Sequence, residues 1–133
     1  MAVKLTDAQK QLLDGKNFAY VATVGEGGEP QVTPVWIEYD GTHVLFNTEE
    51  KRAKVKHMKK DPRIAVCVSD SANPYHYVEI QGTVAEITTD GADAMIDRLA
   101  MKYMGKEKYP FNKPGDVRVV VKIAPEKVLG MGG

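Results

Sequence analysis

Six short segments rich in β-branched and aromatic residues, each bounded by turn residues, most strongly limit how this chain can fold. They cover residues 18–24, 31–39, 42–48, 63–69, 76–88 and 117–123. Asp40 followed by Gly41 is a strong hairpin signal between the second and third segments. The order of these segments predicts a mainly β (α+β) fold, in which about six antiparallel strands form a closed or nearly closed barrel.

Two residues inside these segments predict irregular strands. Pro34 cannot donate a ladder hydrogen bond, so it marks a sheet edge or a bulge. Backbone groups at such a place can face a ligand. Gly82 is expected to bend the long segment 76–88.

Three helical segments are expected at the periphery of this barrel. The first covers residues 6–15, where Thr6 caps the helix, Leu12 and Leu13 dock it and Gly15 ends it. The second is capped by Thr48 and stops at residues 61–62, an Asp-Pro pair. The third covers residues 90–105 and carries an apolar stripe at helical spacing. That stripe consists of Met95, Ile96, Leu99 and Tyr103. We expect residues 1–133 to form a single domain.

Charge and cysteine content exclude several classes of protein. Eighteen Lys and Arg balance eighteen Asp and Glu, which argues against a generally basic nucleic-acid binder. No apolar run approaches the roughly 20 residues of a membrane span, and the amino-terminal residues are polar and amphipathic. We therefore expect a cytoplasmic protein without a membrane or nucleic-acid partner. The single Cys67 excludes an intrachain disulfide, and its apolar surroundings predict a buried small residue rather than a nucleophile.

Known catalytic patterns are missing from the sequence. His43, His57 and His76 form no HExxH pair and no cluster with acidic residues, so no metal site is expected. There is no GxSxG elbow, Walker loop or GxGxxG fingerprint. The catalytic residues stay unassigned. An enzyme of this sequence would depend on a bound organic cofactor for its chemistry.

Positive charge concentrates in the segment from Lys51 to Arg63. This segment contains seven of the eighteen Lys and Arg residues of the chain. Lys51, Arg52 and Lys54 are expected near a helix N-terminus, where the macrodipole is already positive and backbone N–H groups are free. Cations there are unfavourable unless an anion is bound, so the pattern favours a phosphate site. A solvated charged helix and a nucleic-acid contact are the alternatives.

The string QVTPVWIEYDGTHVLFNTEEKRAKVKHMKKDPRIAVCV, followed by NPYHYVEIQGTVAEIT, carries a resemblance. It resembles the split β-barrel family of pyridoxamine 5'-phosphate oxidase-like, FMN-binding flavoproteins. Within that family it is most similar to the small branch that uses the deazaflavin coenzyme F420. TPVW, K-R-x-K, DPR, NPYxYVEIxG and the spacing D.LA.KY.G...YP occur in that order. The resemblance covers about residues 12–129.

The resemblance implies a homodimer with two cofactor sites at its interface. It places a set of cofactor-binding residues in three groups. The implied residues are Thr33, Pro34, Val35 and Trp36 along the ring, Asn47 and Thr48 near the tail, and Lys51, Arg52 and Lys54 on the phosphate. Tyr77 matches a position that reaches the cofactor from a neighbouring strand, and Ala53 departs from an Arg-Lys pair of some FMN-binding members.

Several of these residues also have ordinary structural interpretations. Trp36 and Tyr77 are compatible with plain packing, and Tyr75 and His76 either line a substrate pocket or belong to a loop. Residues 109–111 form either a lid or a surface loop.

The activity implied is hydride transfer from reduced coenzyme F420 to an electron-poor double bond or carbonyl of a small organic molecule. The proton donor is open between solvent, Tyr77 and His76. One alternative is an FMN-binding oxidase or reductase of the same fold. The other is a non-catalytic carrier of a flavin, a deazaflavin or a haem-like ligand.

Overall fold

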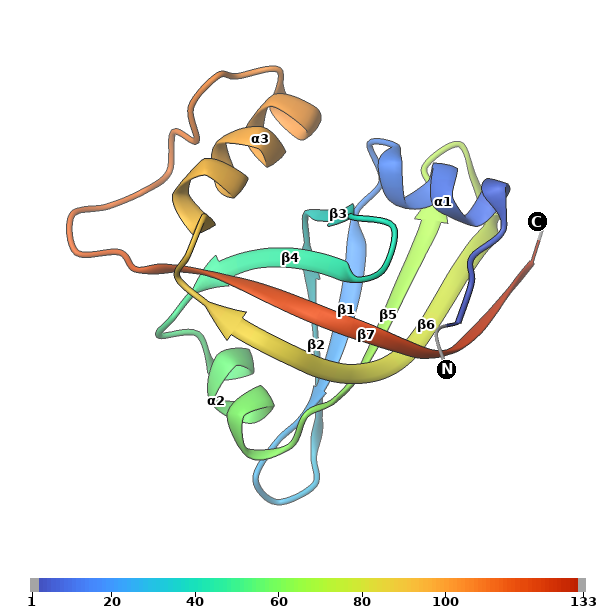
Figure 1. Cartoon of the computed structure of the whole chain (residues 1–133), viewed down its shortest axis with the longest axis horizontal. Helices are drawn as coiled ribbons and strands as arrows, with labels where there is room; N and C mark the ends of the chain where they lie inside the picture. The colour runs from blue at the N-terminus through green and yellow to red at the C-terminus, as the bar shows by residue number, and fades with distance from the viewer. Residues whose placement is uncertain (1–2, 132–133) are drawn as a thin grey trace.

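A computed structural model describes residues 3–131 of the chain (Figure 1). Three helices and seven strands follow one another in it. They are α1 (Asp7–Asp14), β1 (Ala19–Val24), β2 (Pro30–Val35), β3 (Ile37–Tyr39), β4 (Val44–Glu49), α2 (Ala53–Lys60), β5 (Arg63–Asp70), β6 (Asn73–Thr88), α3 (Ala92–Met104) and β7 (Arg118–Met131). None of the described helices has both the length and the apolar character needed to cross a bilayer.

All seven strands belong to one antiparallel sheet, in the order β2-β1-β5-β6-β7-β4-β3. The sheet is strongly curled, with helices at its periphery (Figure 1). The predicted mainly β split barrel is therefore confirmed, with one strand more than expected.

Trp36 joins the two edges of this sheet. Val35 ends β2 at one edge and Ile37 begins β3 at the other. Because consecutive Cα atoms are about 3.8 Å apart, these edges lie within about 8 Å of each other at Trp36. The sheet must curl to allow this. The prediction of one strand over residues 31–39 was wrong, whereas the edge position of Pro34 is confirmed.

The barrel interior is filled by alternate residues of the strands. On β5, Ile64, Val66 and Val68 are buried, while the residues between them point to the outer face. Cys67 is one of these outward residues and is only partly buried, so its predicted burial was wrong. The sequence did not reveal this alternation of buried and outward residues, because most outward positions of β5 are also small or apolar.

The three helices cover different parts of the sheet. The first helix closes the barrel interior with Leu12 and Leu13, and its predicted cap is present as a capping box between Thr6 and Gln9. In contrast, α3 packs on the outside of β4 and β7, through a second apolar cluster that includes Leu45 and Val120. The predicted stripe of α3 is buried. Since β4 and β7 are covered on both faces here, polar side chains at this place are buried too.

The second helix begins later than predicted. Thr48 and Glu49 continue β4 and pair with Val119 and Arg118 of β7, so Thr48 does not cap a helix. A turn follows, and Arg52 occupies the N-cap position without a side-chain cap bond. Two buried residues of α2, Val55 and Met58, dock the helix against the barrel.

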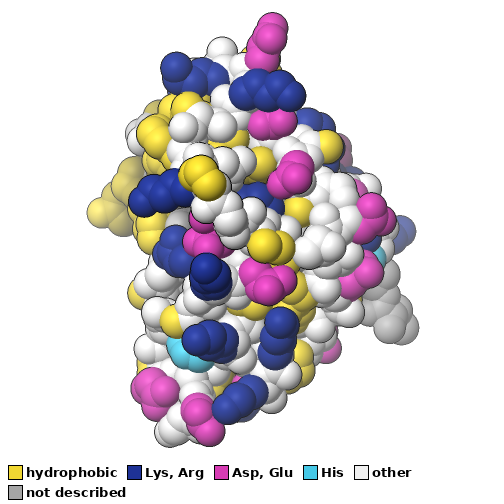
Figure 2. Space-filling view, turned by 90° about the vertical axis from the view of Figure 1, so that its left-hand side faces the viewer, with side chains coloured by type: hydrophobic (Ala, Val, Ile, Leu, Met, Phe, Trp, Pro, Cys, Tyr) yellow, Lys and Arg dark blue, Asp and Glu magenta, His cyan; other side chains and the backbone are white. Residues whose placement is uncertain are grey.

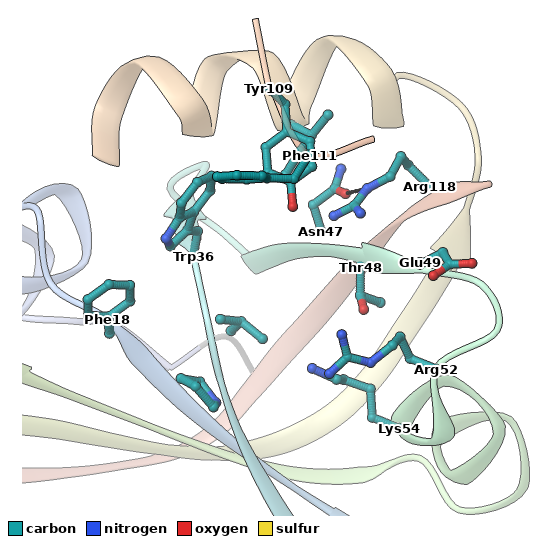
Figure 3. Close-up of a pocket in the computed structure, with 13 residues that line it drawn as sticks. Phe18, Trp36, Asn47, Thr48, Glu49, Arg52, Lys54, Tyr109, Phe111 and Arg118 are labelled. Carbon is teal, nitrogen blue, oxygen red and sulfur yellow. Dashed lines mark hydrogen bonds between the residues drawn. The ribbon is translucent and has the colours of Figure 1, made fainter. Parts of the chain in front are cut away.

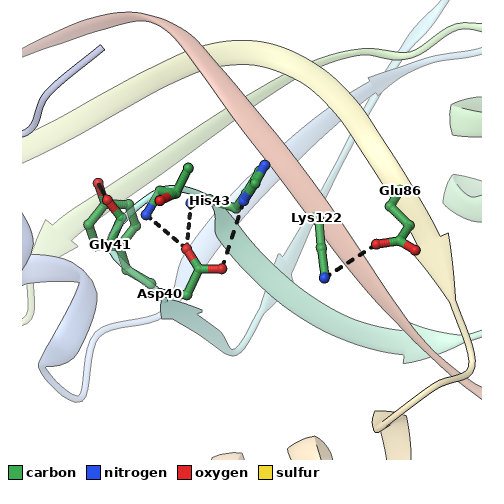
Figure 4. A network of polar contacts seen from close by, with 7 residues as sticks. Asp40, Gly41, His43, Glu86 and Lys122 are labelled. Carbon is green, nitrogen blue, oxygen red and sulfur yellow. Dashed lines mark hydrogen bonds and ion pairs between the residues drawn. The ribbon is translucent and has the colours of Figure 1, made fainter. Parts of the chain in front are cut away.

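One turn and one bulge fix the remaining strands. In the β3–β4 turn, Asp40 Oδ1 accepts hydrogen bonds from the backbone N–H groups of Thr42 (2.8 Å) and His43 (2.6 Å), as Figure 4 shows. The register of β6 shifts at Gly82, where a Cβ atom would collide with the carbonyl oxygen of Ala124. The predicted bend is thus confirmed. Residues 73–75, which precede the predicted segment 76–88, also belong to β6.

Candidate functional site

A pocket of about 240 Å³ lies next to the place where the sheet closes (Figure 3). Its walls come from the end of β2, the end of β4, the start of α2, one residue of α3 and the segment that leads into β7. The lining residues are Phe18, Pro34, Val35, Trp36, Asn47, Thr48, Glu49, Arg52, Lys54, Ile96, Tyr109, Phe111 and Arg118.

Three cations form one end of the pocket. They are Arg52, Lys54 and Arg118. Lys54 is only 4% exposed, and burial, followed by the charges of Arg52 and Arg118, lowers the pKa of its amine to about 8. No carboxylate of residues 3–131 forms an ion pair with any of the three. A buried, unpaired cation beside two guanidinium groups suits a bound anion.

Arg118 is held on two sides. Its Nε donates to Asn47 Oδ1 at 2.8 Å, and its guanidinium carbon lies 5.1 Å from the centre of the Tyr109 ring. The Asn47 amide is fixed in turn, because its Nδ2 donates to the carbonyl of Ala92 at 2.8 Å. Figure 3 shows Arg118 directed toward Asn47 at the wall of the pocket.

Aromatic rings form the other end of the pocket. The Trp36 indole stacks on Tyr103, with ring centroids 5.2 Å apart, and meets the ring of Tyr109 edge-on at 5.8 Å. Phe111 packs against Tyr109 in the same manner at 5.6 Å. Tyr109 and Phe111 thus line the pocket, and a role of residues 109–111 as a lid stays a prediction.

Polar contacts of α3 hold this aromatic end in place. The Tyr103 hydroxyl accepts from the N–H of Ile37 and donates to the carbonyl of Asn17. The Lys102 amine donates to the carbonyls of Leu13 and Ile37 at 2.6 and 2.7 Å. These contacts tie α3 to α1 and to the strand that follows Trp36.

The structure brings together seven of the predicted cofactor-binding residues. Those that line the pocket are Pro34, Val35, Trp36, Asn47, Thr48, Arg52 and Lys54. Thr33 and Lys51 flank this set without lining the pocket, and Lys51 is exposed in the turn before α2. Arg118 was missed, because a lone arginine at the start of a predicted strand carries no signal until the pairing of β7 with β4 is known.

Tyr75, His76 and Tyr77 lie on β6, outside the pocket of the single chain. Tyr75 is 77% exposed. His76 Nδ1 lies 3.7 Å from Asp70, and its Nε2 is buried without a hydrogen-bond partner among the described residues. Their predicted roles at the cofactor or substrate stay predictions.

The second half of the basic segment is a solvated surface. Lys56, Lys59 and Lys60 are exposed, and Lys60 pairs with Glu26 at 3.2 Å. His57 differs from these lysines, since its ring is partly buried and hydrogen-bonded to Thr23. Figure 2 shows basic and acidic side chains interspersed on this face, rather than one continuous basic surface.

Apolar side chains gather on the outer face of the sheet. Val32 is 63% exposed, and the cross-strand register aligns Pro34, Tyr20 and Cys67 in one row from β2 to β5. Exposed Met131 continues this outer face on β7. Large exposed apolar patches on proteins often serve as interaction surfaces.

The fold and the pocket together define a split β-barrel protein with a cleft at its seam that Arg52, Lys54 and Arg118 line at one end. The sequence profile of the pyridoxamine 5'-phosphate oxidase family matches residues 5–132. The chain belongs to this family, as the sequence predicted.

Solved structures agree with this assignment. One described as an F420 reductase has a TM-score of 0.82 and 30% sequence identity, over 94% of this chain and 98% of that chain. A candidate pyridoxamine 5'-phosphate oxidase from Lactobacillus delbrueckii has a TM-score of 0.68 and 24% identity, over 96% and 94%. HupZ from Group A Streptococcus has a TM-score of 0.69 and 20% identity, over 97% and 99%. The last two share the fold, and the first supports the similarity to an F420-using branch.

Proposed function

We propose that this protein is an oxidoreductase that transfers a hydride from reduced coenzyme F420 to an electron-poor double bond or carbonyl of a small organic molecule. The 30% identity to an F420 reductase, over nearly the whole of both chains, supports this choice of cofactor. The observation that carries the proposal is the buried Lys54 amine, which lies beside Arg52 and Arg118 without a carboxylate partner in the described chain.

The pocket residues fit a phosphate-bearing planar cofactor. Arg52 and Lys54 would hold the phosphate, and Lys51 stands at the rim of the same turn. The edge strand β2, from Thr33 to Val35, would lie along the ring, because the described chain places a neighbouring strand on only one of its sides. Backbone N–H and C=O groups on the other side are then free to contact the edge of a ring.

When bound, the reduced deazaflavin would supply the hydride. The protein would contribute orientation and a water-poor surface, which Trp36, Tyr109 and Phe111 provide. A cationic end that fixes the phosphate would set the depth of the ring in the pocket. No side chain of the pocket is assigned as proton donor.

A homodimer is part of the proposal. A volume of about 240 Å³ is smaller than the ~300–1,000 Å³ usual for sites of drug-sized ligands, so a second chain would complete the site. The apolar outer face that includes Tyr20 and Val32 would provide the contact. In such a dimer, Tyr75, His76 or Tyr77 of one chain would be able to reach the pocket of the other. A cytoplasmic location belongs to the same proposal.

FMN is the alternative cofactor, and the match to the pyridoxamine 5'-phosphate oxidase family favours it. Turnover distinguishes the candidates. Purified protein would be mixed with reduced coenzyme F420 and a panel of quinones and enones, and oxidation of the cofactor would be followed by absorbance. We expect turnover with at least one acceptor and its loss in Lys54→Met. Oxidase activity with tightly bound FMN and no reaction with the deazaflavin would favour the alternative, while binding without turnover would indicate a carrier.

A further inference from the structure

Arg118 has a binding edge that the rest of the described chain does not use. Its Nε is occupied by Asn47, but neither of its two terminal nitrogens has a hydrogen bond or an ion pair within residues 3–131. Glu49 lies directly opposite Arg118 in the pairing of β4 with β7, yet the two side chains form no ion pair. Arg118 lines the pocket, so the unused edge is available to a ligand there.

The fixed geometry of Arg118 suits one kind of ligand. The hydrogen bond through Nε and the contact with the Tyr109 ring restrict the guanidinium plane. The end of a guanidinium presents two N–H groups side by side, which match two oxygens of a phosphate or carboxylate. A guanidinium that is already oriented loses less entropy when it binds such a group.

Arg118 also connects the two ends of the pocket. Its charge acts on Lys54 at the cationic end, and its side chain lies against Tyr109 at the aromatic end. Tyr109 is anchored from outside, because its backbone N–H donates to Asp97 of α3 at 2.9 Å. A substitution of Arg118 would therefore change the packing of Tyr109 and, through the edge-on ring contact, that of Trp36.

We propose that Arg118 is a ligand-binding residue, which takes an oxyanion of the pocket's ligand on its free edge and couples that contact to the aromatic wall through Tyr109. The inference rests on the proposed function only in that the ligand carries a phosphate.

The test uses the single tryptophan, Trp36, as a fluorescent probe of the pocket. Inorganic phosphate would be titrated into the full chain and into Arg118→Met, Arg118→Lys and Arg63→Met. Arg63 is a matched control, because it is exposed and paired with Asp61 away from this pocket. We expect phosphate affinity to fall about tenfold or more in Arg118→Met, because the loss of a hydrogen bond to a charged group typically weakens binding by at least this factor. Arg118→Lys should retain part of the affinity, and Arg63→Met should bind as the wild type does within about twofold.

A double-mutant cycle with Tyr109→Leu tests the coupling. If the two residues act as a unit, the double variant should bind phosphate no worse than Arg118→Met alone. Strictly additive losses would overturn the coupling. Equal affinities of the wild type and Arg118→Met, or no phosphate binding by the wild type, would overturn the proposal itself. Should Arg118→Met fail to fold, as judged by circular dichroism, Arg118→Gln replaces it.

Failure of the proposed function would look different. Coenzyme F420 and FMN would be titrated into the same proteins. If phosphate binding depends on Arg118 but neither cofactor binds the wild type, the proposed function fails and the role of Arg118 stands. If a cofactor binds the wild type and Arg118→Met equally well, only the role of Arg118 fails.

Discussion

The indole of Trp36 lies parallel to the phenol ring of Tyr103, with ring centroids 5.2 Å apart and ring planes 5° apart. Trp36 is the residue at which the chain passes from one edge of the sheet to the other. The closure of the barrel is therefore supported from outside by α3. Because Trp36 also lines the pocket, the packing of α3 and the shape of the pocket are linked.

Tyr103→Phe should destabilise the protein while it leaves the ring stack in place. The substitution removes the acceptor of the Ile37 N–H (3.2 Å) and the donor to the Asn17 carbonyl (2.7 Å), both of them buried. We expect the free energy of unfolding, measured in urea, to fall by about 1–3 kcal/mol. Tyr75→Phe is the matched control, because Tyr75 is exposed, and it should change stability by less than about 0.5 kcal/mol. Equal stabilities of Tyr103→Phe and the wild type would show that these bonds contribute nothing.

Phosphate binding should depend on pH through Lys54. Its pKa is lowered to about 8 by burial and by the charges of Arg52 and Arg118. A bound anion favours the charged amine and raises this pKa, so binding above about pH 8 takes up a proton. Phosphate affinity should thus fall by up to about tenfold per pH unit above about pH 8. Trp36 fluorescence titrations measure this fall, and Lys54→Met should abolish it. A wild-type affinity that does not change up to about pH 9.5 would contradict the prediction.

Lys54→Met should stabilise the free protein even though it weakens anion binding. It removes a buried charge that faces two guanidinium groups and keeps an apolar chain of similar length. We expect a gain of about 1–3 kcal/mol in urea unfolding at neutral pH. The folded-state pKa lies below the ordinary value of 10.5, so wild-type stability rises between about pH 8 and 10.5 and the advantage of the variant shrinks there.

The control for this experiment is Lys56→Met, because Lys56 is an exposed residue of the same helix. It should leave both stability and anion affinity nearly unchanged. If Lys54→Met were clearly less stable than the wild type, the prediction would be wrong. The Lys54 amine would then have to form favourable contacts within the protein itself.

Val32→Asp should disrupt the proposed dimer. Val32 is 63% exposed on the apolar outer face of the edge strand β2, so a charge there costs little in an isolated chain. Buried against a second copy, the same charge would be unpaired and unfavourable. Analytical ultracentrifugation should show a dimer for the wild type and a monomer for the variant. Ala94→Asp, an equal change on the exposed side of α3, should remain dimeric. A monomeric wild type at micromolar concentration would disprove the dimer.

Local sequence signals predicted most of the fold. The capped first helix, the edge position of Pro34 and the bend at Gly82 all depend on single residues with distinctive conformational or hydrogen-bonding properties. Long-range pairing was harder to foresee. The start of α2 moved because β7 holds Thr48 and Glu49 in the sheet, and residues 31–39 divide because Trp36 joins two edges that only a curled sheet brings together.

The candidate site shows the same difference between features set by local sequence and features set by long-range packing. Residues near one another in the sequence, such as Arg52 and Lys54, were expected together and do line one pocket. Arg118, Tyr109 and Phe111 come from a distant segment, and only tertiary packing brings them there. The partial exposure of Cys67 was missed for a further reason: an apolar outer face removes the polar alternation that normally distinguishes the two sides of a strand.

The most direct test of the proposed function is a comparison of cofactor affinities. Purified, ligand-free protein would be titrated with coenzyme F420 and with FMN, and the quenching of Trp36 would be followed. The proposal predicts saturable binding of coenzyme F420 at least about tenfold tighter than that of FMN, with both affinities reduced in Lys54→Met. Tight FMN binding without measurable affinity for coenzyme F420 would contradict it.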